Sequence, residues 1–338
     1  MRYVGLDAHL RQSTICVLDD RGRKVLTRSI RGRWSEVLKE LEGIRRPFAV
    51  CFEASTGYGY LHDHLRTMAC RVAVANPGQL RLIFRSKRKN DRVDAEKLAK
   101  LLFLDEVPPV HVPSMEVRSW RRLIGHRQKL IAERTRVKNS IRAMLRSQGV
   151  TAPRGLWSRR STSWLQTAEL STELDAVQRD VLLGRLRALV EMIDRVERAL
   201  NRVACRHPGV QLLKTVPGVG NRTAEAVVAW VDEPGRFQRV RAIGSYFGLV
   251  PSQDASGSVN RLGHITREGP SAVRSLLTEA AWQAIRRSER VRSFYERVKR
   301  GESERRKIAL VATAHYLLRA MLAMLRTGEV WRSESLAA

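Results

Sequence analysis

The spacing of apolar residues divides the chain into a first third with mixed strand and helix patterns and a remainder with mainly helical ones. Short apolar runs predict strands at 3–7, 13–18, 24–30, 47–52 and 71–75. Turn residues at 19–22 join the second and third runs as a hairpin. Apolar residues three and four apart predict helices at 34–46, at 58–68 and from Pro77. We therefore expect an α/β domain at 1–112, and the order of its elements is that of the ribonuclease-H-like fold.

Helical periodicity dominates the middle of the chain. Residues 115–148 carry one apolar stripe and ten Lys or Arg against two Glu, and Pro, Gly and Trp residues at 151–166 predict a connector. Apolar residues then alternate spacings of four and three at 182, 186, 189, 193, 196, 200 and 203. That heptad seam predicts a coiled coil or an antiparallel helical hairpin. Its partner is either the preceding helix of the same chain or a second subunit.

Composition adds a strong charge imbalance to this picture. The 338 residues include 62 Lys or Arg against 34 Asp or Glu, a formal net charge of +28, which favours a nucleic-acid partner. Four cysteines without disulfide or metal-ligand spacing predict free thiols in a reducing cytosol. We find no signal peptide and no apolar run of membrane-spanning length, so we expect a cytoplasmic, nucleoid-associated protein with no membrane partner.

Four carboxylates are the candidate catalytic residues. Asp7 and Glu53 end predicted strands, and Asp91 and Asp94 share one face in the first turn of a predicted helix. Each alone is explained equally well as a strand-end or helix cap. Together they can converge above one edge of a sheet, where four acids require divalent counter-charge. Oxygen ligands favour Mg²⁺ or Mn²⁺, and two ions about 4 Å apart can hold the attacking and leaving oxygens of a phosphoryl transfer.

Basic residues gather in two places. A cluster directly before the acidic helix is suited to holding a polyanion: Arg85, Lys87, Arg88 and Lys89. The 115–148 helix adds Arg127, Arg134 and Lys138. A solvated charged face is the usual explanation of such a helix, but the one-sided sign of its charge favours contact with phosphates.

The last third contains two candidate DNA-contacting segments. Pro217-Gly218-Val219-Gly220 between helical stretches is the helix-hairpin-helix pattern, in which Gly218 and Gly220 let backbone N–H groups approach a phosphate. Residues 248–258 are predicted to be a loop that contains Ser256. Three arginines follow this serine: Arg261, Arg267 and Arg274. A Ser-Gly pair in a loop is commonly a simple turn, and the alternative is a positioned nucleophile.

These segments resemble, in order, the DEDD transposases of bacterial insertion sequences, the group with the Piv/MooV-type invertases and the bridge-RNA-guided recombinases. The residues that carry the resemblance are Gly5-Leu6-Asp7, Phe52-Glu53-Ala54 with Gly57-Tyr58, Asn76-Pro77, 89–95, 217–220 and 248–251 with Ser256-Gly257. The resemblance implies a RuvC-like catalytic domain at 1–112, a basic-helix and coiled-coil section at 113–206, and a C-terminal transposase domain at 207–338. It also implies that Asp7, Glu53, Asp91 and Asp94 bind Mg²⁺ and that Ser256 is the nucleophile.

The resemblance further implies the partners and the reaction. A structured guide RNA would pair with donor and target DNA, and homodimers would assemble into a tetramer. Because exchange between two DNA ends needs more than one protomer, we assign the heptad seam to subunit association. Metals on the four acids would activate Ser256 to form a covalent phosphoserine. Two alternatives stay open: a RuvC-like junction resolvase that uses a metal-activated water, and a non-catalytic nucleic-acid-binding scaffold.

Overall fold

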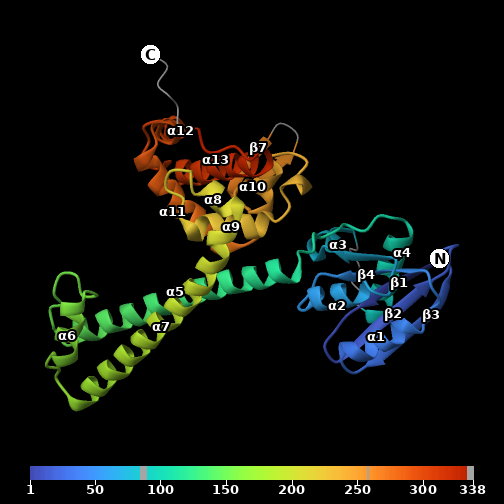
Figure 1. Cartoon of the computed structure of the whole chain (residues 1–338), viewed down its shortest axis with the longest axis horizontal. Coiled ribbons are helices and arrows are strands. Elements are labelled where there is room, and N and C mark those ends of the chain that lie inside the picture. Colours follow the sequence, from blue (N-terminus) through green and yellow to red (C-terminus); the bar gives the residue numbers. More distant parts are fainter. Residues whose placement is uncertain (84–89, 257–258, 333–338) are drawn as a thin grey trace. The chain divides into compact units, whose positions relative to one another are not determined.

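The computed structural model describes residues 1–83, 90–256 and 259–332 and divides into two compact units, Met1–Met115 and Glu116–Ala338. The first unit is built on a five-stranded sheet of order β3-β2-β1-β4-β5 (Figure 1). The strands are β1 (Arg2–Asp7), β2 (Gln12–Leu18), β3 (Lys24–Arg31), β4 (Phe48–Glu53) and β5 (Arg71–Ala75). The first three pair antiparallel, and β4 and β5 continue from β1 in parallel. The α/β class and the five strands are therefore confirmed.

Alternation along β1 sends side chains into two cores, one on each face of the sheet. Val4 and Leu6 are buried in the cluster that contains residues of α1 (Trp34–Glu42) and α2 (Tyr58–Leu65). Tyr3 and Gly5 face α4 (Asp91–Phe103), which lies on the other side of the sheet. The unit also contains α3 (Pro77–Ile83).

Gly5 allows α4 to lie unusually close to β1. A Cβ on this residue would come within 1.9 Å of the Ala95 carbonyl oxygen and 2.4 Å of the Ala99 nitrogen, both of them backbone atoms. Only glycine fits such an approach without displacing the helix. The sequence thus fixes α4 against the strand that ends, two residues later, on Asp7.

A long helical hairpin begins the second unit. Its helices are α5 (Met115–Ser147) and α7 (Glu173–Arg206), with α6 (Arg159–Thr167) at the tip (Figure 1). Leu186 and Ile193 of the heptad seam are buried in one cluster with Ile141 of α5. Most of the seam is covered within one chain, since Leu186, Leu189 and Ile193 are buried, whereas Val203 is 44% exposed. Association of subunits through the seam stays a prediction. The antiparallel helical hairpin, the other interpretation of the pattern, is correct.

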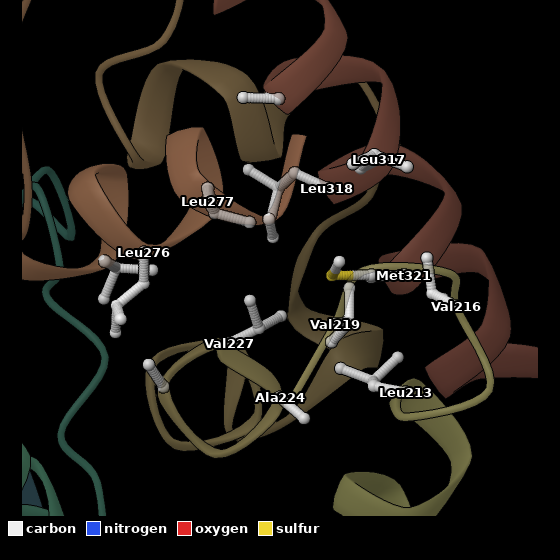
Figure 2. Close-up of a cluster of buried hydrophobic side chains, with 14 of the residues drawn as sticks. Leu213, Val216, Val219, Ala224, Val227, Leu276, Leu277, Leu317, Leu318 and Met321 are labelled. Carbon is white, nitrogen blue, oxygen red and sulfur yellow. The ribbon is translucent and has the colours of Figure 1, made fainter. Parts of the chain in front are cut away.

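The rest of the second unit packs around one apolar core (Figure 2). Its elements are α8 (Pro208–Leu213), α9 (Asn221–Val231), η1 (Pro234–Arg236), α10 (Ala242–Tyr246), β6 (Pro251–Ser256), β7 (Val259–Ile265), α11 (Ser271–Arg287), α12 (Glu289–Lys299) and α13 (Arg306–Thr327). Val227 of α9, Leu277 of α11 and Met321 of α13 meet in this core. Trp120 of α5 and Leu200 of α7 belong to the same cluster, so the base of the hairpin is part of it.

Two predictions for this unit are corrected by the structure. Residues 251–256 form β6 of an antiparallel pair with β7, where a loop was predicted. Every residue of β6 is exposed, so it lacks the apolar alternation by which a strand is recognised. In addition, α13 is long and apolar enough to cross a membrane, contrary to our expectation from the sequence. Leu317, Leu318 and Met321 of α13 are fully buried, which accounts for its apolar character as a core helix.

Candidate active site and nucleic-acid interface

The carboxyl edge of the sheet holds the first two predicted acids. β1 and β4 run parallel with Leu6 opposite Phe52, so Asp7 and Glu53 end neighbouring strands. The Asp7 side chain is 16% exposed, whereas Glu53 is exposed to solvent. Parallel pairing therefore delivers two carboxylates to one edge, as expected from the sequence pattern.

The N-terminus of α4 brings Asp91 to the same edge. Its cap is Asn90, whose side-chain oxygen accepts a hydrogen bond from the backbone N–H of Arg92 at 3.0 Å. Since Asn90 caps the helix, the alternative explanation of Asp91 as the capping residue does not apply. The first turn of α4 then presents two acids, Asp91 and Asp94, next to the end of β1.

A histidine joins the acids in the closest group. Ligand atoms of Asp7, His9 and Asp91 all lie within 4.8 Å of one another, and His9 Nε2 lies 3.3 Å from Asp7 Oδ1. The two carboxylates suit Mg²⁺ or Mn²⁺, and the imidazole is a ligand more typical of transition metals. His9 was missed in the sequence analysis. The available signal was a histidine two residues after a strand-end aspartate.

The electrostatics of the group favour a bound cation. Burial raises the pKa of Asp7, the His9 imidazole opposes the rise, and the carboxylates of Asp91 and Asp94 add to it. A second carboxylate therefore makes ionisation of Asp7 more costly, and a divalent cation would remove that cost. Asp94 itself accepts a hydrogen bond from Lys97 Nζ at 3.2 Å.

Two hydrogen bonds with Ser13 hold the main chain of His9. Its N–H donates to Ser13 Oγ at 3.2 Å, and Ser13 Oγ donates back to the His9 carbonyl at 3.1 Å. Ser13 is 1% exposed and lies in β2, so the connection between β1 and β2 is anchored on the sheet. These hydrogen bonds fix the main chain from which the His9 side chain projects.

Of the four predicted acids, the structure places Asp7 and Asp91 in the close group and adds His9. Asp94 lies near enough to affect Asp7 but is paired with Lys97. Glu53 lies at the same sheet edge, outside the close group.

The basic residues of the sequence analysis have varied surroundings. Arg85, Lys87, Arg88 and Lys89 lie outside the described residues. Arg127 Nε donates to Glu197 Oε1 at 2.7 Å and so links α5 to α7. Arg134 is half-buried, and Lys138 Nζ lies 4.8 Å from the centre of the Trp157 ring. Part of the basic charge of α5 is thus used in holding the hairpin together.

The two glycines of the Pro-Gly-Val-Gly turn differ in their surroundings. Gly218 has φ +85°, and a Cβ there would lie 2.6 Å from the Ala284 nitrogen, so packing against α11 requires this glycine. At Gly220 a Cβ would meet no atom within 4 Å. Gly220 therefore presents the more open backbone for the approach of a phosphate.

Ser256 ends β6 and is exposed, opposite Val259 of β7. Of the three arginines that follow, Arg261 is exposed on β7 and Arg267 has φ +57°. Arg274, in contrast, is hydrogen-bonded to the main chain. Its Nη1 donates to the carbonyl oxygens of Glu268 at 2.6 Å and Gly269 at 3.1 Å. These hydrogen bonds attach the segment that follows β7 to α11.

Comparison with known proteins covers both units. Residues 4–148 match the DEDD transposase domain of the IS110 group, and residues 210–296 match the transposase domain of the IS116/IS110/IS902 family. The chain belongs to the IS110/IS116 family of insertion-sequence transposases. Members of this family cleave and rejoin DNA.

Individual relatives agree with this assignment. The transposase for insertion sequence element IS1111A of Coxiella burnetii is 27% identical over 290 residues, 85% of this chain and 78% of the relative. A probable family 20 transposase of Pseudomonas aeruginosa is 28% identical over 274 residues, 79% of this chain and 80% of the relative. The transposase for element IS1328 of Yersinia enterocolitica is 27% identical over 266 residues, 77% and 78% of the two chains.

Proposed function

We propose that this transposase cuts and rejoins DNA by using one or two Mg²⁺ or Mn²⁺ ions. These ions would be held at the edge of the sheet where the neighbouring strands β1 and β4 end. The observation that carries the proposal is the meeting of Asp7, His9 and Asp91 within 4.8 Å. Two elements remote in sequence, β1 and α4, supply these groups, and Gly5 fixes their contact. Glu53 and Asp94, at the same edge, are the proposed further ligands.

The fold supports this assignment. A sheet of order β3-β2-β1-β4-β5, with three antiparallel strands followed by two parallel ones, is the arrangement expected of a ribonuclease-H-like domain. We also propose that α8, the turn 214–220 and α9 act as a helix-hairpin-helix element, with Gly220 as the backbone contact to phosphate.

The chain's own residues do two tasks in the proposed reaction. When bound, the metal stabilises negative charge on the scissile phosphate and lowers the pKa of the attacking hydroxyl. Asp7, Asp91 and His9 hold and orient that cation. Ser256 supplies the hydroxyl: its Oγ–phosphorus bond forms while a backbone phosphorus–oxygen bond breaks, its proton is lost, and the released DNA oxygen gains one. The exposure of Ser256 on β6 leaves it accessible to a strand.

The proposed partners are donor and target DNA, a structured guide RNA, and further copies of the chain that assemble as a homodimer and then a tetramer. The net charge of +28 supports polyanionic partners. Co-purification of a discrete RNA transcribed beside the gene tests the guide, and mass photometry of the chain with and without that RNA tests the stoichiometry.

Nicking of a supercoiled plasmid in Mg²⁺ or Mn²⁺ tests the metal site. Asp91→Asn is expected to abolish nicking because a carboxylate ligand is lost. The matched control is Asp105→Asn, an exposed acid just beyond the other end of α4. Nicking by Asp91→Asn at the wild-type rate would remove the acidic cluster from the reaction.

Trapping of a protein–DNA species that survives denaturation tests the serine. Ser256→Ala is expected to lose this adduct, whereas Ser252→Ala, on the same exposed strand, is expected to retain it. If Ser256→Ala still recombines DNA normally, the covalent step is wrong. If the wild type nicks DNA without any adduct, hydrolysis by water in the manner of a junction resolvase replaces it.

A further inference from the structure

Three aromatic rings form a stack on the surface of the first unit. Trp34 of α1 and Tyr60 of α2 have ring centres 6.0 Å apart and planes 26° from parallel. The His64 ring lies one helical turn further along α2, with its centre 4.1 Å from that of Tyr60 and its plane tilted by 38°. Tyr60 is 46% exposed, and His64 is exposed as well. Aromatic surface of this kind is costly to leave in water unless something covers it.

The local structure holds these rings in place. Gly57 has φ +85°, and a Cβ there would lie 2.0 Å from the Trp34 ring, so the indole occupies space that only glycine leaves open. His64 Nδ1 donates to the Tyr60 carbonyl at 2.8 Å, which fixes the orientation of the imidazole. The stack is therefore ordered before any ligand arrives.

A hydrogen bond ties the stack to the acidic cluster. The indole Nε1–H of Trp34 donates to the carbonyl oxygen of His9 at 3.1 Å. The His9 side chain belongs to the close group with Asp7 and Asp91. One residue therefore contributes its side chain to the candidate metal site and its main chain to the aromatic stack, which places the two sites side by side.

Positive charge flanks the same region. Arg33 directly precedes Trp34, Arg31 ends β3, and Arg11 accepts a main-chain hydrogen bond from Gly32 at 2.9 Å. All three arginine side chains are exposed. Guanidinium groups beside an aromatic surface are the combination with which proteins bind single strands, arginine holding phosphates and rings stacking on bases.

We propose that Trp34, Tyr60 and His64 form a stacking platform for an unpaired DNA base next to the phosphate that is cut. The proposal rests on the proposed function only in placing that phosphate at the acidic cluster. A base in a duplex has both faces covered by its neighbours, so the platform selects a strand that is locally unpaired. Because every base has an aromatic face, the platform tolerates different sequences.

Binding of a fluorescein-labelled single-stranded DNA to the full chain, without divalent metal, tests the platform. Tyr60→Leu keeps an apolar side chain on α2 but removes the ring, and it is expected to weaken binding about 10-fold. Tyr60→Phe is expected to bind like the wild type. Val25→Ala, an exposed apolar position on β3, is the matched control and is expected to change nothing.

A strand of abasic sites separates stacking from other effects. The wild type is expected to bind it about 10-fold less tightly than the intact strand, and Tyr60→Leu is expected to cause no further loss on it. An equal loss on intact and abasic strands would overturn the platform. A loss seen with an RNA strand of the same sequence but not with DNA would overturn the assignment to DNA. Because metal is absent, failure of the nicking test leaves this result unaffected.

Discussion

Gly5 of β1 and Ala95 of α4 meet backbone to backbone: a Cβ on Gly5 would lie 1.9 Å from the Ala95 carbonyl oxygen. Asp7 is two residues beyond this contact on the strand, and Asp91 is one helical turn before it on the helix. The spacing of the two carboxylates therefore depends on a residue with no side chain. The geometry of the candidate metal site is set by main-chain packing, which side-chain mutations at the site itself would not reveal.

Replacement of Gly5 by alanine is expected to displace α4 and destabilise the fold by about 1–3 kcal/mol, the usual cost of overpacking. Its Mn²⁺ affinity is expected to fall with it, because Asp91 moves with the helix. Urea unfolding and calorimetric Mn²⁺ titration measure the two effects. Gly184→Ala, in α7 with open space around it, is the control and is expected to be neutral or stabilising by up to about 1 kcal/mol. A Gly5→Ala protein of wild-type stability would contradict the packing argument.

His9→Ala is expected to weaken Mn²⁺ binding about 10-fold, the lower end of the effect of losing a group that ligates or orients at a metal site. The loss is expected to be smaller for Mg²⁺, which prefers oxygen ligands and gains less from an imidazole. Calorimetric titration with each ion gives the comparison. His126→Ala, an exposed histidine on α5, is expected to bind both ions normally. Unchanged Mn²⁺ affinity in His9→Ala would exclude the imidazole from the site.

Glu225 on α9 is 1% exposed, and its Oε1 lies 3.0 Å from Arg222 Nη1. Burial raises the pKa of Glu225 to about 7, and Arg222 and Arg127 only partly oppose the rise. The folded chain therefore holds this proton at pH values where the unfolded chain, with its ordinary pKa near 4.5, has released it. The resulting stabilisation is complete below pH 4.5 and is lost as the pH rises through 7.

The pH dependence of unfolding with and without Glu225 measures this contribution. Between pH 4.5 and 7.5 the wild type is expected to lose about 3 kcal/mol relative to Glu225→Gln, which cannot ionise. Comparison of the two proteins at each pH cancels the titration of the other groups. A constant difference in the free energy of unfolding across this range would mean that Glu225 is ionised throughout in the folded state.

Sequence pattern predicted those parts of the fold that bury an alternating or periodic apolar face. Strands β1, β2, β4 and β5 and the carboxylates at the ends of β1 and β4 were predicted because buried strands form recognisable apolar runs with a definite last residue. β3, which has no buried residue, was predicted from the turn that joins it to β2. β6 was missed because all six of its residues are exposed, which leaves no burial pattern to detect.

The errors at the site and in the hairpin have different physical origins. His9 lies outside any buried period, and a hydrogen bond from Trp34 to its carbonyl oxygen joins it to a residue 25 positions away, which sequence spacing does not encode. The seam of α7 was assigned to a second subunit, whereas most of it packs against α5 of the same chain, because a heptad pattern gives the position of an apolar stripe and not the identity of the helix that covers it. Arg127 was assigned to nucleic acid, and its ion pair with Glu197 depends on the same hairpin.

The base of that hairpin has a mechanical consequence. Trp120 at one end of α5 and Leu200 near the end of α7 are buried among the side chains of α9, α11 and α13. Both helices of the hairpin are thus packed into the core of the domain that carries Ser256. A ligand that binds the tip around α6 would therefore act on this core through both helices of the hairpin.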